Sequence, residues 1–160
     1  MLKIISGAQT GVDRGALNAA LALQIPCGGW CPADRCAEDG IIAPRYPVTP
    51  LPNAGYRKRT RQNVLDSDAT IIIYHTQIHL GSGTALTLKT CLEKHKLFLL
   101  IDAQTVSTAI AGQNIARFVQ QHNIRVLNFG GPRQSSVPDI ERYTEQSVTR
   151  AIQLLTTKAA

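Results

Sequence analysis

Short apolar runs alternate along this chain with longer segments in which apolar residues recur every three or four positions. The runs predict strands over residues 2–6, 69–74, 97–102 and 125–129. The helical spacing predicts helices over residues 12–23, 84–95 and 140–155, and another around Ala111, Ile115, Phe118 and Val119. This alternation predicts a doubly wound, Rossmann-like α/β fold, with a mostly parallel sheet and helices on both faces.

The alternation stops between Pro26 and Arg59. Six of the eight prolines and four of the 12 glycines lie in this segment, which has no sustained periodicity, although residues 27–31 could add a short strand. A long irregular stretch inside a compact domain usually carries function, so we expect a functional loop. A solvated surface excursion is the alternative.

The composition narrows the range of partners. A chain of 160 residues that is 44% hydrophobic can bury one good core, so we expect a single domain over residues 1–160. No apolar run approaches membrane-spanning length and the chain opens on a strand-like segment, so we expect a cytoplasmic protein without a membrane partner. The formal charge of +6 suits an anion, but only 5% of residues are aromatic, which favours a small anion over nucleic acid.

The cysteines do not have the spacing of a metal site. Cys27, Cys31 and Cys36 crowd one segment and Cys91 stands alone, and the four histidines supply no second half of a zinc site. We therefore predict no metal site. Small buried residues or a local redox pair are the alternative roles for these cysteines.

A glycine-rich turn follows the apolar run 69–74 and leads into a predicted helix. It contains Gly81, Ser82, Gly83 and Thr84. Glycines let an anion approach the backbone, and the hydroxyl groups lie beside the unpaired N–H groups of the first helical turn. The turn therefore predicts a phosphate site, although the same pattern also serves plain tight turns.

Three other loops lie where strands of an open parallel sheet would end, which is where such sheets bind ligands. After the first strand, the candidate ligand-binding residues are Ser6, Gly7, Gln9, Thr10, Gly11 and Asp13; capping of the helix is the alternative role of Asp13. After the strand 125–129, they are Gly131 and Arg133, with a surface arginine as the alternative. At the start of a helix that we predict near residue 60, they are Thr60, Arg61 and Asn63, whereas Arg57 and Lys58 are better explained as solvated charges.

Several common site motifs are missing from the sequence. It has no Gly-x4-Gly-Lys-Ser/Thr segment, which argues against a P-loop triphosphatase, and no Gly-x-Gly-x-x-Gly after the first strand, which argues against a standard dinucleotide site. No serine, cysteine or histidine has a recognisable nucleophile context. His75 and His79 could act as acid or base, but lone histidines are more often structural.

Four blocks of sequence resemble a known family. They are SGAQTGVDRGAL at 6–17, RTRQNVLDSDAT at 59–70, GSGT at 81–84 and NFGGPR at 128–133. In this order they resemble the family named putative molybdenum carrier proteins, the circularly permuted YpsA-related branch of the SLOG superfamily. The resemblance implies a Rossmann-like sheet, a nucleotide or nucleotide-derived ligand, and assembly into homo-oligomers, as dimers or tetramers.

Two departures from the related patterns bear on function. The family usually has Gly-Pro-Arg-Glu-Ser and Pro-Gly-Ile, where this chain has Gly131-Pro132-Arg133-Gln134-Ser135 and Pro138-Asp139-Ile140. At the phosphate turn, the related LOG hydrolases of the superfamily have a pattern similar to Gly-Gly-x-Gly-Thr-x-x-Glu. Their glutamate serves N-glycosidic hydrolysis, and the resemblance places Thr87 of this chain at its position. A threonine cannot replace a carboxylate in charge stabilisation or proton transfer.

We therefore expect a binding protein for a small, phosphate-bearing, nucleotide-like anion. It would require no cofactor, and the bound molecule would be a nucleotide or the molybdenum cofactor, a pterin with a phosphate tail. The alternative is a nucleotide-processing hydrolase of the phosphoribohydrolase type that uses Asp13, Glu38 or Asp39 in place of the missing glutamate.

Overall fold

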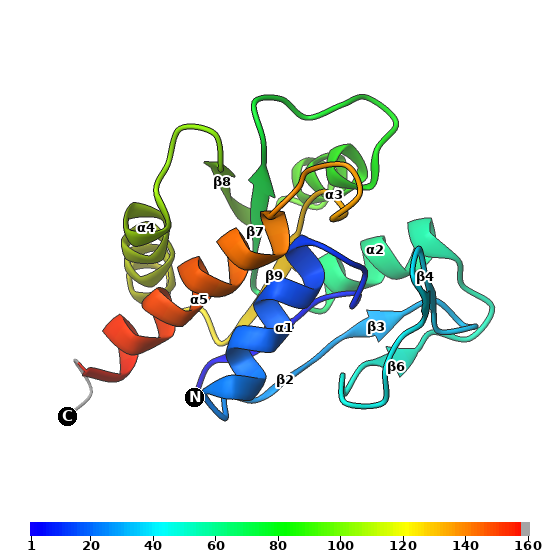
Figure 1. The fold of residues 1–160 in the computed structure, drawn as a ribbon, viewed down its shortest axis with the longest axis horizontal. Helices are drawn as coiled ribbons and strands as arrows, with labels where there is room; N and C mark the ends of the chain where they lie inside the picture. The colour runs from blue at the N-terminus through cyan, green and yellow to red at the C-terminus, as the bar shows by residue number, and fades with distance from the viewer. Residues whose placement is uncertain (158–160) are drawn as a thin grey trace.

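A five-stranded parallel sheet forms the centre of the computed structural model, which describes residues 1–157 (Figure 1). Its spatial order is β2-β1-β9-β7-β8. The strands are β1 (Lys3–Ile5), β2 (Cys27–Gly28), β7 (Ala69–Tyr74), β8 (Leu97–Asp102) and β9 (Val126–Gly130). The four predicted strands are present, and the predicted α/β fold class is confirmed.

Helices cover both faces of this sheet. On one face lie α1 (Val12–Ala22), α4 (Thr108–Gln121) and α5 (Ile140–Thr157), and on the other lie α2 (Tyr56–Leu65) and α3 (Gly83–Glu93) (Figure 1). The alternation along β7 follows from this arrangement: Ile71 and Ile73 join the core with α1, α4 and α5, and Ile72 packs between α2 and α3. Burial on both faces explains why β7 is a continuous apolar run. Among the described helices, none combines the length and the apolar character that crossing a bilayer requires.

The order of the strands along the chain is rotated relative to a standard doubly wound sheet. β9 comes last in sequence yet lies between β1 and β7, parallel to both. If β9 is numbered first and β1, β2, β7 and β8 follow it, the spatial order reads 3-2-1-4-5. This order matches the Rossmann arrangement. The topological switch point is therefore between β9 and β7, and a glycine-rich loop follows each of these two strands.

The irregular segment forms a small packed unit. β3 (Trp30–Cys31) pairs in parallel with β6 (Thr49–Pro50), and β4 (Cys36–Ala37) forms a hairpin with β5 (Gly40–Ile41). Cys31, Ile42, Tyr46 and Val48 are buried in a second core cluster with Leu17 of α1. A solvated excursion is therefore the wrong description of this segment, because its apolar residues are covered.

Candidate functional site

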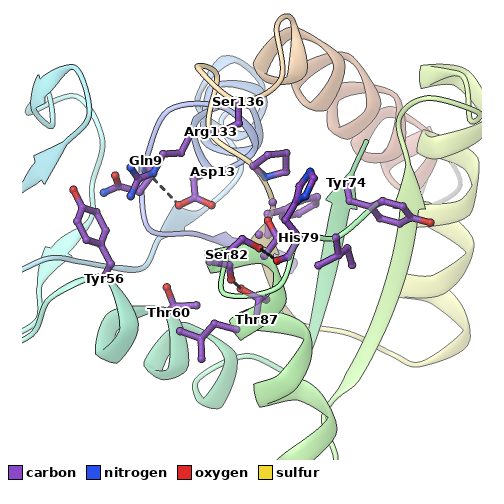
Figure 2. A pocket seen from close by; sticks show the side chains of 18 of the residues that line it. Gln9, Asp13, Tyr56, Thr60, Tyr74, His79, Ser82, Thr87, Arg133 and Ser136 are labelled. Carbon is purple, nitrogen blue, oxygen red and sulfur yellow. Dashed lines mark hydrogen bonds between the residues drawn. The ribbon is translucent and has the colours of Figure 1, made fainter. Parts of the chain in front are cut away.

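A cavity of about 480 Å³ opens at the carboxyl ends of β7 and β9, beside the β1–α1 loop and between α2 and the start of α3 (Figure 2). Its position agrees with the ligand crevice expected at a switch point. Its polar and charged lining residues are Gln9, Asp13, Tyr56, Arg57, Arg59, Thr60, Asn63, Tyr74, His75, Gln77, His79, Ser82, Thr84, Thr87, Asn128, Arg133 and Ser136.

One face of α2 forms a wall of the cavity. Tyr56, Arg59, Thr60 and Asn63 have the i, i+3, i+4, i+7 spacing of a single helical face, and all four line the space. Arg61 is exposed and lies outside the lining. The helix begins at Tyr56, so the prediction of a start near residue 60 was wrong.

Asn63 lines the cavity but uses its amide elsewhere. Its Oδ1 accepts from the Trp30 N–H at 2.8 Å, and its Nδ2 donates to the Trp30 carbonyl at 2.9 Å. This residue therefore joins α2 to β3, and its contribution to the cavity is mainly one of shape.

The start of α3 presents free backbone donors to the cavity. Ser82 caps the helix: its hydroxyl accepts from the Ala85 N–H at 3.1 Å and donates to the His79 carbonyl at 2.6 Å. The N–H groups of Gly83 and Thr84 lie in the first turn, where no intrahelical acceptor is available. Gly81 has φ +78°, and a β-carbon on Gly81 or Gly83 would meet no atom within 4 Å. The predicted phosphate turn thus borders open space, with two N–H groups free to bind an anion.

A buried ion pair lies beside this turn. Asp13, which is 5% exposed, is 3.3 Å from Nη1 of Arg59. Burial raises the pKa of Asp13, and the Arg59 guanidinium and the Gln9 N–H oppose that rise. A β-carbon on Gly7 would overlap the Arg59 guanidinium, so Gly7 makes room for this arginine.

Three buried side-chain atoms in the lining have no hydrogen-bond partner among the described residues. They are Oε1 of Gln9, Nε of Arg59 and Oδ1 of Asn128. The other amide atoms hold both side chains in place, since Gln9 Nε2 donates to the Cys36 carbonyl at 3.0 Å and Asn128 Nδ2 donates to Thr70 Oγ1 at 3.2 Å. Buried polar atoms are nearly always paired. Each of these three atoms is shielded from solvent, so it lies within the wall of the cavity and not on its open surface.

The charge of the lining favours an anion. Arg57, Arg59 and Arg133 contribute guanidinium groups, and Asp13 is the sole carboxylate in the lining of the described cavity. The Arg133 guanidinium lies 4.9 Å from the centre of the Tyr56 ring, which connects the β9–α5 loop to the start of α2.

Some predicted binding residues of the β1–α1 loop are used within the protein. The Ser6 hydroxyl donates to the Asp13 carbonyl at 2.9 Å, the Thr10 hydroxyl bonds Glu38, and Gly11 packs against the Pro132 carbonyl. These three residues lie outside the cavity lining, whereas Gln9 and Asp13 of the same loop line it.

The other two carboxylates considered as catalytic groups attach the β4–β5 hairpin to the molecule. Glu38 accepts from the Ser135 hydroxyl at 2.5 Å as well as from Thr10, and these bonds lower its pKa. Asp39 pairs with Arg14 at 2.5 Å, which lowers the pKa of that carboxyl. Neither lines the cavity.

Among the lining residues that were missed as ligand-binding candidates, the sequence carries a signal for Asn128 and for Arg59. Asn128 is a polar residue within the apolar strand β9, and Arg59 shares the helical spacing of Thr60 and Asn63. Thr87 also lines the cavity, and its hydroxyl donates to the Gly83 carbonyl at 3.0 Å. Gly81, Gly131 and Arg133 lie in the lining, as do His75 and His79.

The described residues contain no group of three or more His, Cys, Asp or Glu side chains placed to hold a metal ion. The four cysteines are free thiols, and Cys31 and Cys91 are buried. Burial raises the pKa of both of these thiols.

The sequence and the fold were compared with known proteins. The model of the family described as "Circularly permutated YpsA SLOG family" matches residues 4–152. A crystal structure from Syntrophus aciditrophicus SB, of a protein named "Putative molybdenum carrier protein", is similar to this chain with a TM-score of 0.90 and 40% identity, over 95% of each chain. A search of curated proteins found no match.

Proposed function

The chain belongs to the circularly permuted YpsA SLOG family, and from this premise we propose that its cavity binds a small, phosphate-bearing, nucleotide-derived ligand. The observation that carries the proposal is the start of α3, where the N–H groups of Gly83 and Thr84 border open space in a cavity rich in arginine. A helix N-terminus binds a phosphate through such N–H groups and through its dipole.

The molybdenum cofactor is one ligand of this class, and the name of the similar crystal structure brings it into consideration. It consists of a pterin ring and a phosphate tail, and in this protein it would be cargo. The chemistry of the lining suits such a molecule: the start of α3 would hold the phosphate, and the polar and apolar side chains of the other walls would border the ring. A nucleoside monophosphate has the same two parts, so both belong to the proposed class.

Mass spectrometry of small molecules released from the purified protein tests the proposal. We expect a phosphorylated heterocycle, and we expect the emptied protein to bind nucleoside monophosphates in calorimetry. Release of no phosphorylated compound, together with no binding of nucleoside monophosphates or inorganic phosphate, would refute the proposed function.

A further inference from the structure

The strand β8 lies at an edge of the central sheet and consists almost entirely of apolar residues. It pairs with β7 on one side, and no strand of the described chain pairs with its other side. Residues 97–101 read Leu-Phe-Leu-Leu-Ile, without a charge, a proline or a bulge. Leu97 and Leu100 are 44% and 41% exposed. Natural proteins usually protect an edge strand with a charge, a proline or a bulge, so an edge without them indicates a partner.

Two residues of β8 point their backbone groups away from the sheet. Along a parallel pair, every second residue of a strand bonds the neighbouring strand. The Ala103 N–H donates to the Tyr74 carbonyl at 2.7 Å, and the register between β7 and β8 is continuous, so the odd-numbered residues of β8 bond β7. The N–H and C=O groups of Phe98 and Leu100 therefore point outward, and they have no partner among the described residues.

These outward groups can pair with a second copy of themselves. In an antiparallel pairing with Leu99 on a two-fold axis, Phe98 of one copy lies opposite Leu100 of the other, and each residue both donates and accepts. This register uses every outward group of the two residues. The N–H of Lys96 and the carbonyl of Asp102 are already bonded within the chain. Moving the axis to Phe98 or Leu100 would place an outward group opposite one of these bonded groups.

The side chains match in the same register. Every cross-strand pair within residues 97–101 joins two apolar side chains, including Phe98 with Leu100. At the ends, Lys96 lies opposite Asp102, so the basic end of one strand meets the acidic end of the other. Both side chains already make hydrogen bonds within the chain, so this match favours the antiparallel orientation without requiring a salt bridge.

We propose that β8 is a homodimer interface, in which two copies of this chain join their edge strands antiparallel, with Leu99 on the two-fold axis, into one continuous sheet. A second copy fits this edge because the outward backbone groups, the apolar side chains and the end charges are each self-complementary. A two-fold contact closes on itself, so a third copy cannot add to the same edge.

Sedimentation of the full chain over a range of concentrations tests the interface. We expect a dimer, and we expect Leu100→Lys to raise the dissociation constant of that dimer by about tenfold or more, because the interface would bury the new charge. Leu21→Lys is the matched control, since Leu21 is 36% exposed on α1, which packs over β1 in the other half of the sheet. Circular dichroism checks that both variants fold.

A monomer at every concentration, an open-ended assembly, or a dimer as tight in Leu100→Lys as in the parent would overturn the inference. A tetramer that Leu100→Lys reduces to a dimer would support β8 as one of two interfaces. None of these outcomes depends on the ligand of the cavity, so the proposed function is tested separately.

Cysteine cross-linking tests the register. In Leu99→Cys the two new thiols face each other across the axis, where Cα atoms are about 4.5 Å apart, within the range of a disulfide. In Leu97→Cys the two thiols lie about 14 Å apart, at about 3.4 Å per residue, which is too far. We expect mild oxidation to link Leu99→Cys into a covalent dimer and to leave Leu97→Cys unlinked. The unmodified protein, with its four free cysteines, controls for linkage through the native thiols.

No covalent dimer in Leu99→Cys, or an equal yield in Leu97→Cys, would overturn the proposed pairing. A covalent dimer confined to Leu99→Cys would support it, and this result decides the matter if Leu100→Lys does not fold.

Discussion

Glycines around the cavity serve two different purposes at the scale of single residues. Gly7 leaves room for the Arg59 guanidinium, and a β-carbon on Gly131 would overlap the Ile73 carbonyl and the Val12 side chain. At Gly83, by contrast, a β-carbon would enter empty space. The sequence indicated that glycines in these loops permit a close approach, but it could not say what approaches. At Gly7 and Gly131 the neighbour is the protein itself, and at Gly83 the space remains open for a ligand.

Gly83→Val should weaken phosphate binding and leave the fold intact. The new methyl groups would occupy the space in front of the free N–H groups, and the first turn of a helix tolerates valine at a cost of less than about 1 kcal/mol. We expect calorimetry to show an affinity for nucleoside monophosphates lowered by about tenfold or more, with unchanged circular dichroism.

Gly55→Val is the matched control. Gly55 precedes α2, its β-carbon would also meet open space, and it lies outside the cavity lining. Undiminished affinity in a folded Gly83→Val protein would exclude this turn as the phosphate site.

Arg133→Lys tests whether the shape of the cation matters as well as its charge. Lysine keeps the charge but loses the planar group that lies over the Tyr56 ring and could fork onto a phosphate. We expect about a three- to tenfold loss of affinity that persists across salt concentrations. Arg61→Lys, at an exposed position outside the lining, should have no effect. Parental affinity in Arg133→Lys would show that the planar group is not used.

Secondary-structure elements explain which binding residues the sequence could identify. With α2 assumed to begin near residue 60, Thr60, Arg61 and Asn63 looked like neighbours. The helix begins at Tyr56, and its inward face then contains Arg59 and excludes Arg61. An error of one turn at the start of the helix therefore put Arg61 among the predicted binding residues in place of Arg59. Helix boundaries are poorly specified by composition, whereas the side chains on one face follow directly once the start is known.

The strands also show which elements a sequence pattern can predict and which it cannot. Long apolar runs predicted β7 and β8. β7 is buried on both faces, whereas β8 is the edge strand and its Leu97 and Leu100 are exposed. The strands β3 to β6 have two residues each, which is too short for any periodicity, so only the excess of proline and glycine marked their segment. Thr10 looked free in sequence because its partner Glu38 lies 28 residues away, in the β4–β5 hairpin.

The attachment of the β4–β5 hairpin should depend on pH. The pKa values of Glu38 and Asp39 are lowered by their partners in the folded protein, so the carboxylates stabilise the fold above their ordinary pKa values, near 4. That contribution is lost as the pH falls through the lowered values. We expect thermal unfolding to show the parent more stable than Glu38→Gln at pH 7, with a smaller difference at pH 3. A difference of equal size at both values would contradict the role of the ionised carboxylate.

At the scale of the whole molecule, the position of β9 completes the site. Periodicity predicts that a strand exists but not which strands it joins, so the placement of β9 between β1 and β7 could not be derived from the apolar pattern. This placement brings Asn128 and the Arg133 loop next to the phosphate turn, although more than 40 residues separate them in the chain. The family resemblance implied a Rossmann-like sheet, and the strand order supplies the physical reason that distant blocks of sequence form one cavity.

The whole molecule should bind nucleotides without hydrolysing them. Cleavage of an N-glycosidic bond develops positive charge on the sugar, which a nearby carboxylate stabilises and a hydroxyl does not. The resemblance to the LOG hydrolases places their glutamate at Thr87, whose hydroxyl here donates to the Gly83 carbonyl. Of the three carboxylates considered in its place, Glu38 and Asp39 lie outside the cavity lining, and Asp13 is paired with Arg59.

We therefore expect no useful release of free base from nucleoside monophosphates, measured by chromatography, and we expect any such activity to require Thr87→Glu. Loss of one well-placed electrostatic contact commonly lowers a rate by about 10²–10³, so slow residual turnover agrees with a binding protein. Fast turnover by the unmodified protein, abolished by Asp13→Asn while the affinity for nucleotide is retained, would establish the hydrolase instead. Because Asp13→Asn keeps the size of the side chain, that result would identify its carboxylate as the group that stabilises the developing charge.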